Sequence, residues 1–118
     1  MSEADGEELD FFLMANLRPA TTGLPMVVWV SERGLARHDL RVEVSAVHGA
    51  RVQYASMATV AVRPAPRLVA GNLSAADLQA VSEWIRRNEA VLLAYWDSQI
   101  DTAELIQRLR PLSPPLPP

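Results

Sequence analysis

The chain has 118 residues, no cysteine, 49% hydrophobic and 21% charged residues, and a net charge of −3. A chain of this size and composition can bury the core of one globular domain without disulfides or metal. The missing cysteines exclude a disulfide framework, a thiolate nucleophile and a cysteine zinc site. No apolar run approaches the ~20 residues that cross a bilayer, and the acidic start is unlike a secretory signal. The composition therefore predicts a cytoplasmic protein without membrane contact.

The charges are distributed unevenly along the chain. Residues 1–10 hold five acidic side chains and no basic one, which gives −5, whereas the remainder holds nine acids and eleven arginines, which gives +2. Lysine is absent, and together with the frequent alanine and proline this is typical of a genome rich in G and C. An acidic arm thus precedes a mildly basic body.

Residues 1–13 are predicted to form this flexible arm, because an acidic, glycine-containing segment lacks the pattern of a core element. The arm ends in an apolar cluster with Phe11 and Phe12, which can dock on the body or on a partner. If translation instead starts at Met14, the arm is not part of the protein.

The first half of the body predicts an antiparallel meander of three or four strands. In residues 40–44, hydrophobic and charged residues alternate, so Leu40, Val42 and Val44 are expected to face the core. Arg41 and Glu43 are expected to face solvent. The predicted strands cover residues 26–31, 40–44, 51–54 and 57–62, with a short edge strand at 67–70.

The second half predicts helices. Ser74 begins residues 75–97 as an N-cap, with Asp77 as a short form of the capping-box acid. The apolar residues of this helix fall on one broad side, and a kink near Asn88 would divide it in two. Asp101 opens a short final helix that Pro111 stops.

Strands followed by helices predict an α+β fold, in which an antiparallel meander packs against the long C-terminal helix, with the short final helix beside it. We expect one domain over residues 14–110, preceded by the arm. A proline-rich tail at 111–118 is expected to adopt polyproline II or to be disordered.

Candidate chemistry is sparse, and no catalytic residue, metal site or cofactor is predicted. His38 and Asp39 are the only adjacent histidine–acid pair, so a hydrolase or small-molecule site around them is one alternative. Neighbouring strand residues point to opposite faces, however, which favours a surface histidine. His48, beside Gly49, is expected in a turn. The chain contains neither a phosphate-binding glycine loop nor a G-x-S-x-G motif.

Two further groups of polar residues stand out. The arginines of the sheet half offer an anion-binding surface and hence weak nucleic-acid binding as a second alternative; the candidates are Arg37, Arg41, Arg51 and Arg63. Asn88 lies within the apolar arc of the long helix. Because a buried amide needs hydrogen-bond partners, it is expected to bond a strand backbone group or to face a polar interface, and the structural role is favoured.

Residues 84–109 contain Asn88, Leu92, Leu93 and Trp96 in an N-x-x-x-L-L-x-x-W pattern. This segment resembles the C-terminal part of small bacterial proteins known only as domains of unknown function, although their P-P-H-x-H strand motif is missing here. The resemblance covers about a quarter of the chain. It implies an α+β fold and, through the toxin–antitoxin neighbourhoods of some relatives, a protein partner.

The leading hypothesis is therefore a small non-enzymatic protein-interaction module, an adaptor or the antitoxin-like half of a pair, whose partner is another protein. It rests on the absence of a convergent set of nucleophile, base and oxyanion donors. The expected docking elements are the arm with Phe11 and Phe12, the strand edge near Arg67, and the end of the long helix at Tyr95 and Trp96.

Overall fold

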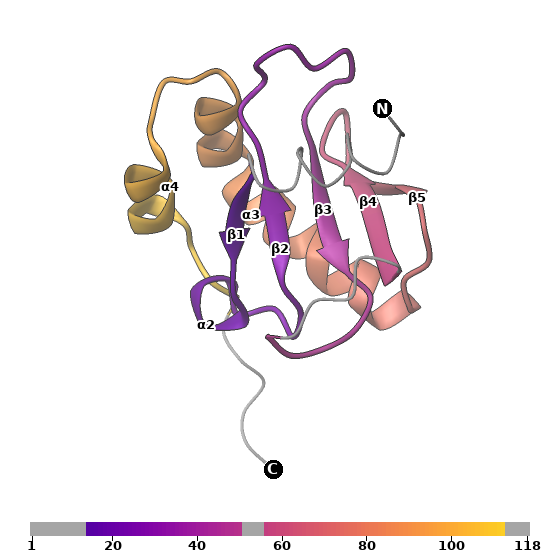
Figure 1. The fold of residues 1–118 in the computed structure, drawn as a ribbon. Coiled ribbons are helices and arrows are strands. Elements are labelled where there is room, and N and C mark those ends of the chain that lie inside the picture. Colours follow the sequence, from indigo (N-terminus) through magenta and orange to yellow (C-terminus); the bar gives the residue numbers. More distant parts are fainter. Residues whose placement is uncertain (1–13, 51–55, 113–118) are drawn as a thin grey trace, which may run out of the picture.

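The computed structural model describes residues 14–50 and 56–112, which form a sheet covered by helices (Figure 1). The five strands make one antiparallel sheet in chain order: β1 (Ala15–Leu17), β2 (Val28–Val30), β3 (Arg41–Ser45), β4 (Met57–Ala61) and β5 (Arg67–Ala70). The helices of the described ranges are α2 (Pro19–Thr22), α3 (Ala75–Trp96) and α4 (Thr102–Arg108). The predicted α+β fold is confirmed, with five strands in place of three or four.

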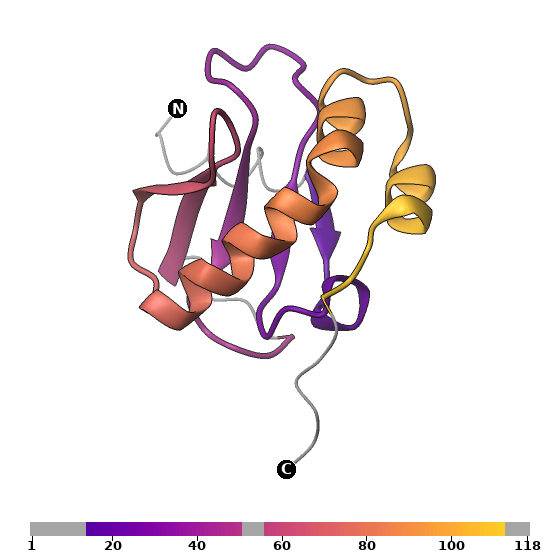
Figure 2. The same ribbon diagram turned by 180° about the vertical axis from the view of Figure 1, so that it is seen from behind.

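The core lies between the sheet and α3, which crosses one face of the sheet diagonally (Figure 2). Each strand contributes alternate side chains to this layer, and α3 contributes its apolar arc. The largest fully buried core side chains include Trp84 and Ile85 of α3 and Val28, Val30 and Val42 of the central strands.

The strand boundaries differ from prediction at the two ends of the sheet. β1 was not predicted, because three residues are too short for an alternation pattern. β5 forms where the edge strand was expected, and its pairing with β4 shifts register between Thr59 and Val60. The strand predicted at 51–54 lies outside the described residues.

α3 is one continuous helix of 22 residues, so it is not divided at Asn88. The Ser74 side chain accepts a hydrogen bond from the Asp77 backbone N–H at 3.1 Å, as the capping pattern predicts. The Asp77 carboxylate, however, contacts His48 Nε2 at 2.9 Å. This hydrogen bond links the loop after β3 to the first turn of α3, a long-range contact that the capping pattern did not predict.

Residues 110–112, here called the closing segment, join the end of the chain to the β1 side of the sheet. The Asn88 side chain is 2% exposed and hydrogen-bonds the backbone of Arg110 on both sides: its Nδ2 donates to the carbonyl at 3.0 Å, and its Oδ1 accepts from the N–H at 2.7 Å. The Leu112 N–H donates to the Thr22 carbonyl at 2.9 Å. Asn88 therefore bonds the closing segment and not a strand, and Leu112 hydrogen-bonds the backbone beside β1.

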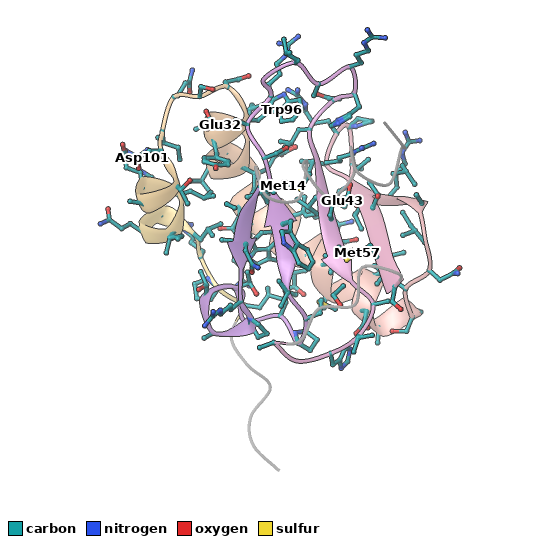
Figure 3. The ribbon with its side chains drawn as sticks, in the orientation of Figure 1. Met14, Glu32, Glu43, Met57, Trp96 and Asp101 are labelled. Carbon is teal, nitrogen blue, oxygen red and sulfur yellow. The ribbon has the colours of Figure 1, made fainter. Side chains whose placement is uncertain are left out.

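The sheet face opposite α3 is also buried at its centre. Glu43 was expected to face solvent, but it is 7% exposed and lies in register between Trp29 of β2 and Thr59 of β4 (Figure 3). Alternation assigns side chains to faces but does not show whether the second face is open. The expectation for Glu43 was therefore wrong.

Among the helices of residues 14–50 and 56–112, none combines the length and hydropathy needed to cross a bilayer.

Candidate functional site

A hollow of about 340 Å³ lies at one end of the sheet, where the β2–β3 loop meets the end of α3 and the beginning of the β4–β5 turn. Most of its lining side chains are charged, and we call it the arginine hollow. It is lined by Arg33, Ala36, Arg37, His38, Asp39, Arg63, Trp96 and Asp97. The structure thus brings His38 and Asp39 together with Arg37 and Arg63, two of the predicted anion-binding residues.

A second hollow of about 520 Å³ opens on the same loop and shares Arg33, Ala36 and His38 with the first. Met14 and Arg41 also line it, as does Leu35, whose side chain is fully exposed at the loop tip. The second hollow is lined by fewer charged side chains than the arginine hollow. The arginine hollow is therefore the better candidate for binding a charged ligand.

The β2–β3 loop is anchored to the end of α3. The Arg33 backbone N–H donates to the Trp96 carbonyl at 2.8 Å, and Ser98 Oγ donates to Glu32 Oε2 at 2.7 Å. Glu32 and Trp96 accordingly lie at the same end of the molecule (Figure 3). These contacts position the loop side chains relative to Trp96, which no local sequence pattern predicts.

Asp39 and Arg63 form an exposed ion pair at the rim of the hollow. Arg63 Nε donates to Asp39 Oδ2 at 3.0 Å, and Arg63 Nη2 donates to Asp39 Oδ1. These hydrogen bonds lower the pKa of Asp39, with smaller contributions from the Leu40 backbone and the charge of Arg33. They also raise the pKa of Arg63. The charge of Arg63 is therefore neutralised by a carboxylate of the same chain.

His38 does not form an acid–base pair with the Asp39 carboxylate. Its Nδ1 lies 2.8 Å from the Asp39 backbone carbonyl, so Nδ1 carries the proton that this contact needs. Its ring also lies against the indole of Trp96, with 5.7 Å between the ring centroids. The geometry therefore positions the ring but does not activate it as a general base.

Arg41 does not line the arginine hollow and pairs instead with Glu43 on the outer sheet face. Its Nε is 3.4 Å from Glu43 Oε1, and Thr59 Oγ1 donates to Glu43 Oε2 at 2.6 Å. Burial raises the pKa of Glu43 despite these two favourable contacts. Arg41 therefore compensates a buried carboxylate. Arg51 lies outside the described residues.

The docking surface expected at the end of the long helix is not available. Tyr95 and Trp96 are 3% and 2% exposed, and both belong to the hydrophobic core. The last turn of α3 still faces the sheet and the loop before α4, so these rings are covered by the fold itself. Tyr95 Oη lies 2.9 Å from Thr102 Oγ1 at the start of α4. The expectation that they bind a partner was wrong. Phe11 and Phe12 lie outside the described residues.

The third expected docking element, the strand edge near Arg67, is exposed. Arg67, Val69 and Ala70 of β5 are exposed, with Val69 at 47%. Beyond β5 the views show no helix or strand of the described residues (Figures 1 and 2). In contrast, α4 lies on the β1 side of the sheet.

Arg33 is the residue of the hollow that sequence reasoning missed. It was counted in the basic stretch but not selected, because the signal was net charge alone. Its role depends on the bond between its backbone and Trp96, 63 residues later in the chain.

In residues 14–50 and 56–112, no three His, Asp or Glu side chains lie together as a possible set of metal ligands. Comparisons of the chain with protein-family models, with curated proteins and with solved structures find no match. The resemblance to small bacterial domains stays a prediction.

Proposed function

We propose that the chain is a small protein-interaction module that binds an extended segment of a partner protein along β5. The observation that carries the proposal is the open edge: β5 is the last strand of the sheet, and its residues Arg67, Val69 and Ala70 are exposed. An edge strand presents unpaired N–H and C=O groups that can pair with a strand from another chain.

The edge carries features that restrict indiscriminate pairing. β5 has only four residues, it follows Pro66, and it begins with the charged Arg67. Its register shift against β4 adds an irregularity. Short length, proline, charge and bulges are the devices by which proteins protect sheet edges from aggregation, so this edge favours a short, selected partner segment over continuous self-assembly.

The role of an adaptor or of the antitoxin-like half of a pair belongs to this proposal, and it draws on the resemblance of residues 84–109. So do a bacterial setting, which that resemblance implies, and a cytoplasmic one, which the composition favours. In this scheme α3 and the closing segment stabilise the sheet, while β5 provides the contact.

The experiment is selection of peptides from a random display library against the full chain. Selected peptides are then measured against three variants. Val69→Pro removes a backbone N–H of β5, whereas Val69→Thr keeps the N–H and replaces the side chain. Ile106→Thr is the matched control, because Ile106 on α4 is 46% exposed and Val69 is 47% exposed.

Pairing along β5 predicts that Val69→Pro weakens peptide binding by about tenfold or more, since one pairing position is lost. Val69→Thr and Ile106→Thr should retain most of the affinity. Circular dichroism verifies that each variant is folded. Equal binding by Val69→Pro, or a library that yields no binder, would overturn the proposal. Concentration-dependent dimerisation that Val69→Pro abolishes would instead assign the edge to a second copy.

A further inference from the structure

The arginine hollow contains more positive charge than its own carboxylates neutralise. Arg33, Arg37 and Arg63 line it together with Asp39 and Asp97, which leaves a net charge of +1 when His38 is neutral. Asp39 pairs with Arg63. Within the described residues, no ion pair involves the guanidinium of Arg33 or Arg37, so two arginine forks at this site are free for an anion.

The loop that carries these two arginines is held in place before any ligand arrives. The Arg33 N–H bonds the Trp96 carbonyl, and the Ala36 N–H donates to the Arg33 carbonyl at 2.8 Å, which closes a turn between the two arginines. Gly34 in this turn has a φ of +49°, a conformation that favours glycine. Because the turn is fixed at α3, less backbone entropy is lost when a ligand binds.

His38 adds a third polar group. Its Nδ1–H donates to the Asp39 carbonyl, and its ring lies against Trp96, so Nε2 is the nitrogen available to a ligand, and in the doubly protonated ring it donates to an anion oxygen. The ring itself is exposed. Two guanidinium forks and an imidazole nitrogen can thus converge on one group from different residues of the same loop.

We propose that the arginine hollow binds the phosphate group of a small phosphomonoester, held by Arg33 and Arg37 with His38 as a further contact. A phosphate group has three terminal oxygens, which can accept hydrogen bonds from three side chains at once, whereas a carboxylate has two. Arginine pairs with phosphate oxygens in a bidentate geometry that lysine cannot reproduce.

The dimensions fit this ligand class. A hollow of about 340 Å³ exceeds the volume of a phosphate group alone and leaves space for a small attached moiety. Asp97 also lines the hollow and repels further phosphate groups beyond the one bound, which argues against a long polyanion. The site lies at the end of the sheet and does not depend on pairing along β5.

The test is titration of the full chain with inorganic phosphate, phosphoserine, serine and a single-stranded oligonucleotide. Binding is measured by calorimetry and by the amide NMR shifts of residues 31–40. We expect saturable binding of phosphate and phosphoserine, and no binding of serine. Arg33→Gln and Arg37→Gln should each weaken phosphoserine binding about tenfold, the typical worth of a charge-assisted contact. Arg86→Gln is the control, because Arg86 is exposed on the far side of α3 from the core and forms no ion pair with a described residue.

Absence of saturable phosphate binding would overturn the proposal, as would equal effects of Arg86→Gln and Arg33→Gln. Tighter binding of the oligonucleotide, with a steep loss of affinity in salt, would replace it with a nucleic-acid site. Val69→Pro should leave phosphoserine binding unchanged, so failure here and failure of the β5 proposal are distinguishable.

Discussion

The two edges of the sheet differ in how far the rest of the described chain covers them. On the β1 side, α4 and the closing segment join the sheet to α3, through Asn88 on one side and Thr22 on the other. On the β5 side, the described chain passes directly into α3 and leaves the strand exposed (Figure 2). The covered edge therefore stabilises the fold, whereas the exposed edge is the one that can contact a partner.

Asn88→Ala tests the closed side and has the largest expected effect. It removes the side-chain bonds to the Trp84 carbonyl and to both backbone groups of Arg110, and it leaves the part-buried Arg110 groups without this partner. We expect a loss of about 3 kcal/mol in the free energy of unfolding, measured by urea denaturation. Asn72→Ala, at an exposed asparagine, is the control. A loss below that of the control would show that the closing segment does not stabilise the fold.

Gly23→Ala tests the same side of the sheet, at the contact between Gly23 and the closing segment. Gly23 has a φ of +77°, and an added Cβ would lie 2.2 Å from the Leu112 carbonyl oxygen. We expect about 2 kcal/mol of destabilisation from strain and displacement of the closing segment. Gly34→Ala, where φ is +49° and the space around the Cβ is open, should cost about 1 kcal/mol. Equal midpoints of thermal unfolding for the two variants would contradict close contact between Gly23 and Leu112.

Glu43→Gln probes the middle of the sheet, which neither edge should influence. Because burial raises the pKa of Glu43 above its ordinary value of 4.5, the folded state binds its proton more tightly than the unfolded state. The stabilising contribution of this proton is complete below pH 4.5 and is lost as the pH rises through the folded-state pKa. Neutral pH therefore lowers the stability of the wild type at Glu43, because the unfolded chain releases this proton more readily than the folded state does.

Glutamine keeps an acceptor for Thr59 and has no charge, so Glu43→Gln should stabilise the protein at pH 7 by about 1 kcal/mol. The gain should shrink as the pH falls toward 4.5. Urea unfolding of both proteins across this range measures it. A variant that is less stable than wild type at pH 7 would show that the contact between Arg41 and Glu43 outweighs the cost of burial.

Val69→Thr has the smallest expected effect. Val69 is an exposed residue of the open edge, and its substitution should change the free energy of unfolding by less than about 0.5 kcal/mol. Chemical denaturation measures the change. A loss above about 1 kcal/mol would indicate that the edge is packed against something and is not open.

The sequence predicted the elements that depend on local chemistry. The capping residues Ser74 and Asp101 mark helix starts, and alternation at residues 40–44 marks a central strand. It also placed the edge strand that became β5. These signals are contained within a few neighbouring residues, so one sequence is enough to detect them.

What the sequence did not predict depends on contacts between distant residues. The partner of Asn88 is 22 residues away, and the burial of Glu43 depends on Trp29 and Thr59. Trp96 was expected to bind a partner because its helix face was known but its neighbours were not. Arg33 enters the arginine hollow only through its bond to Trp96. Each is a property of the assembled sheet and helix.

Hydrogen exchange of backbone amides in a dilute monomeric sample tests the difference between the two edges most directly. The account predicts slow exchange at Arg110 and Leu112, whose N–H groups bond Asn88 Oδ1 and the Thr22 carbonyl. It predicts fast exchange at those amides of β5 (Arg67–Ala70) that point away from β4. Uniformly slow exchange across β5, equal to that of the closing segment, would contradict the account, because that edge would already be occupied.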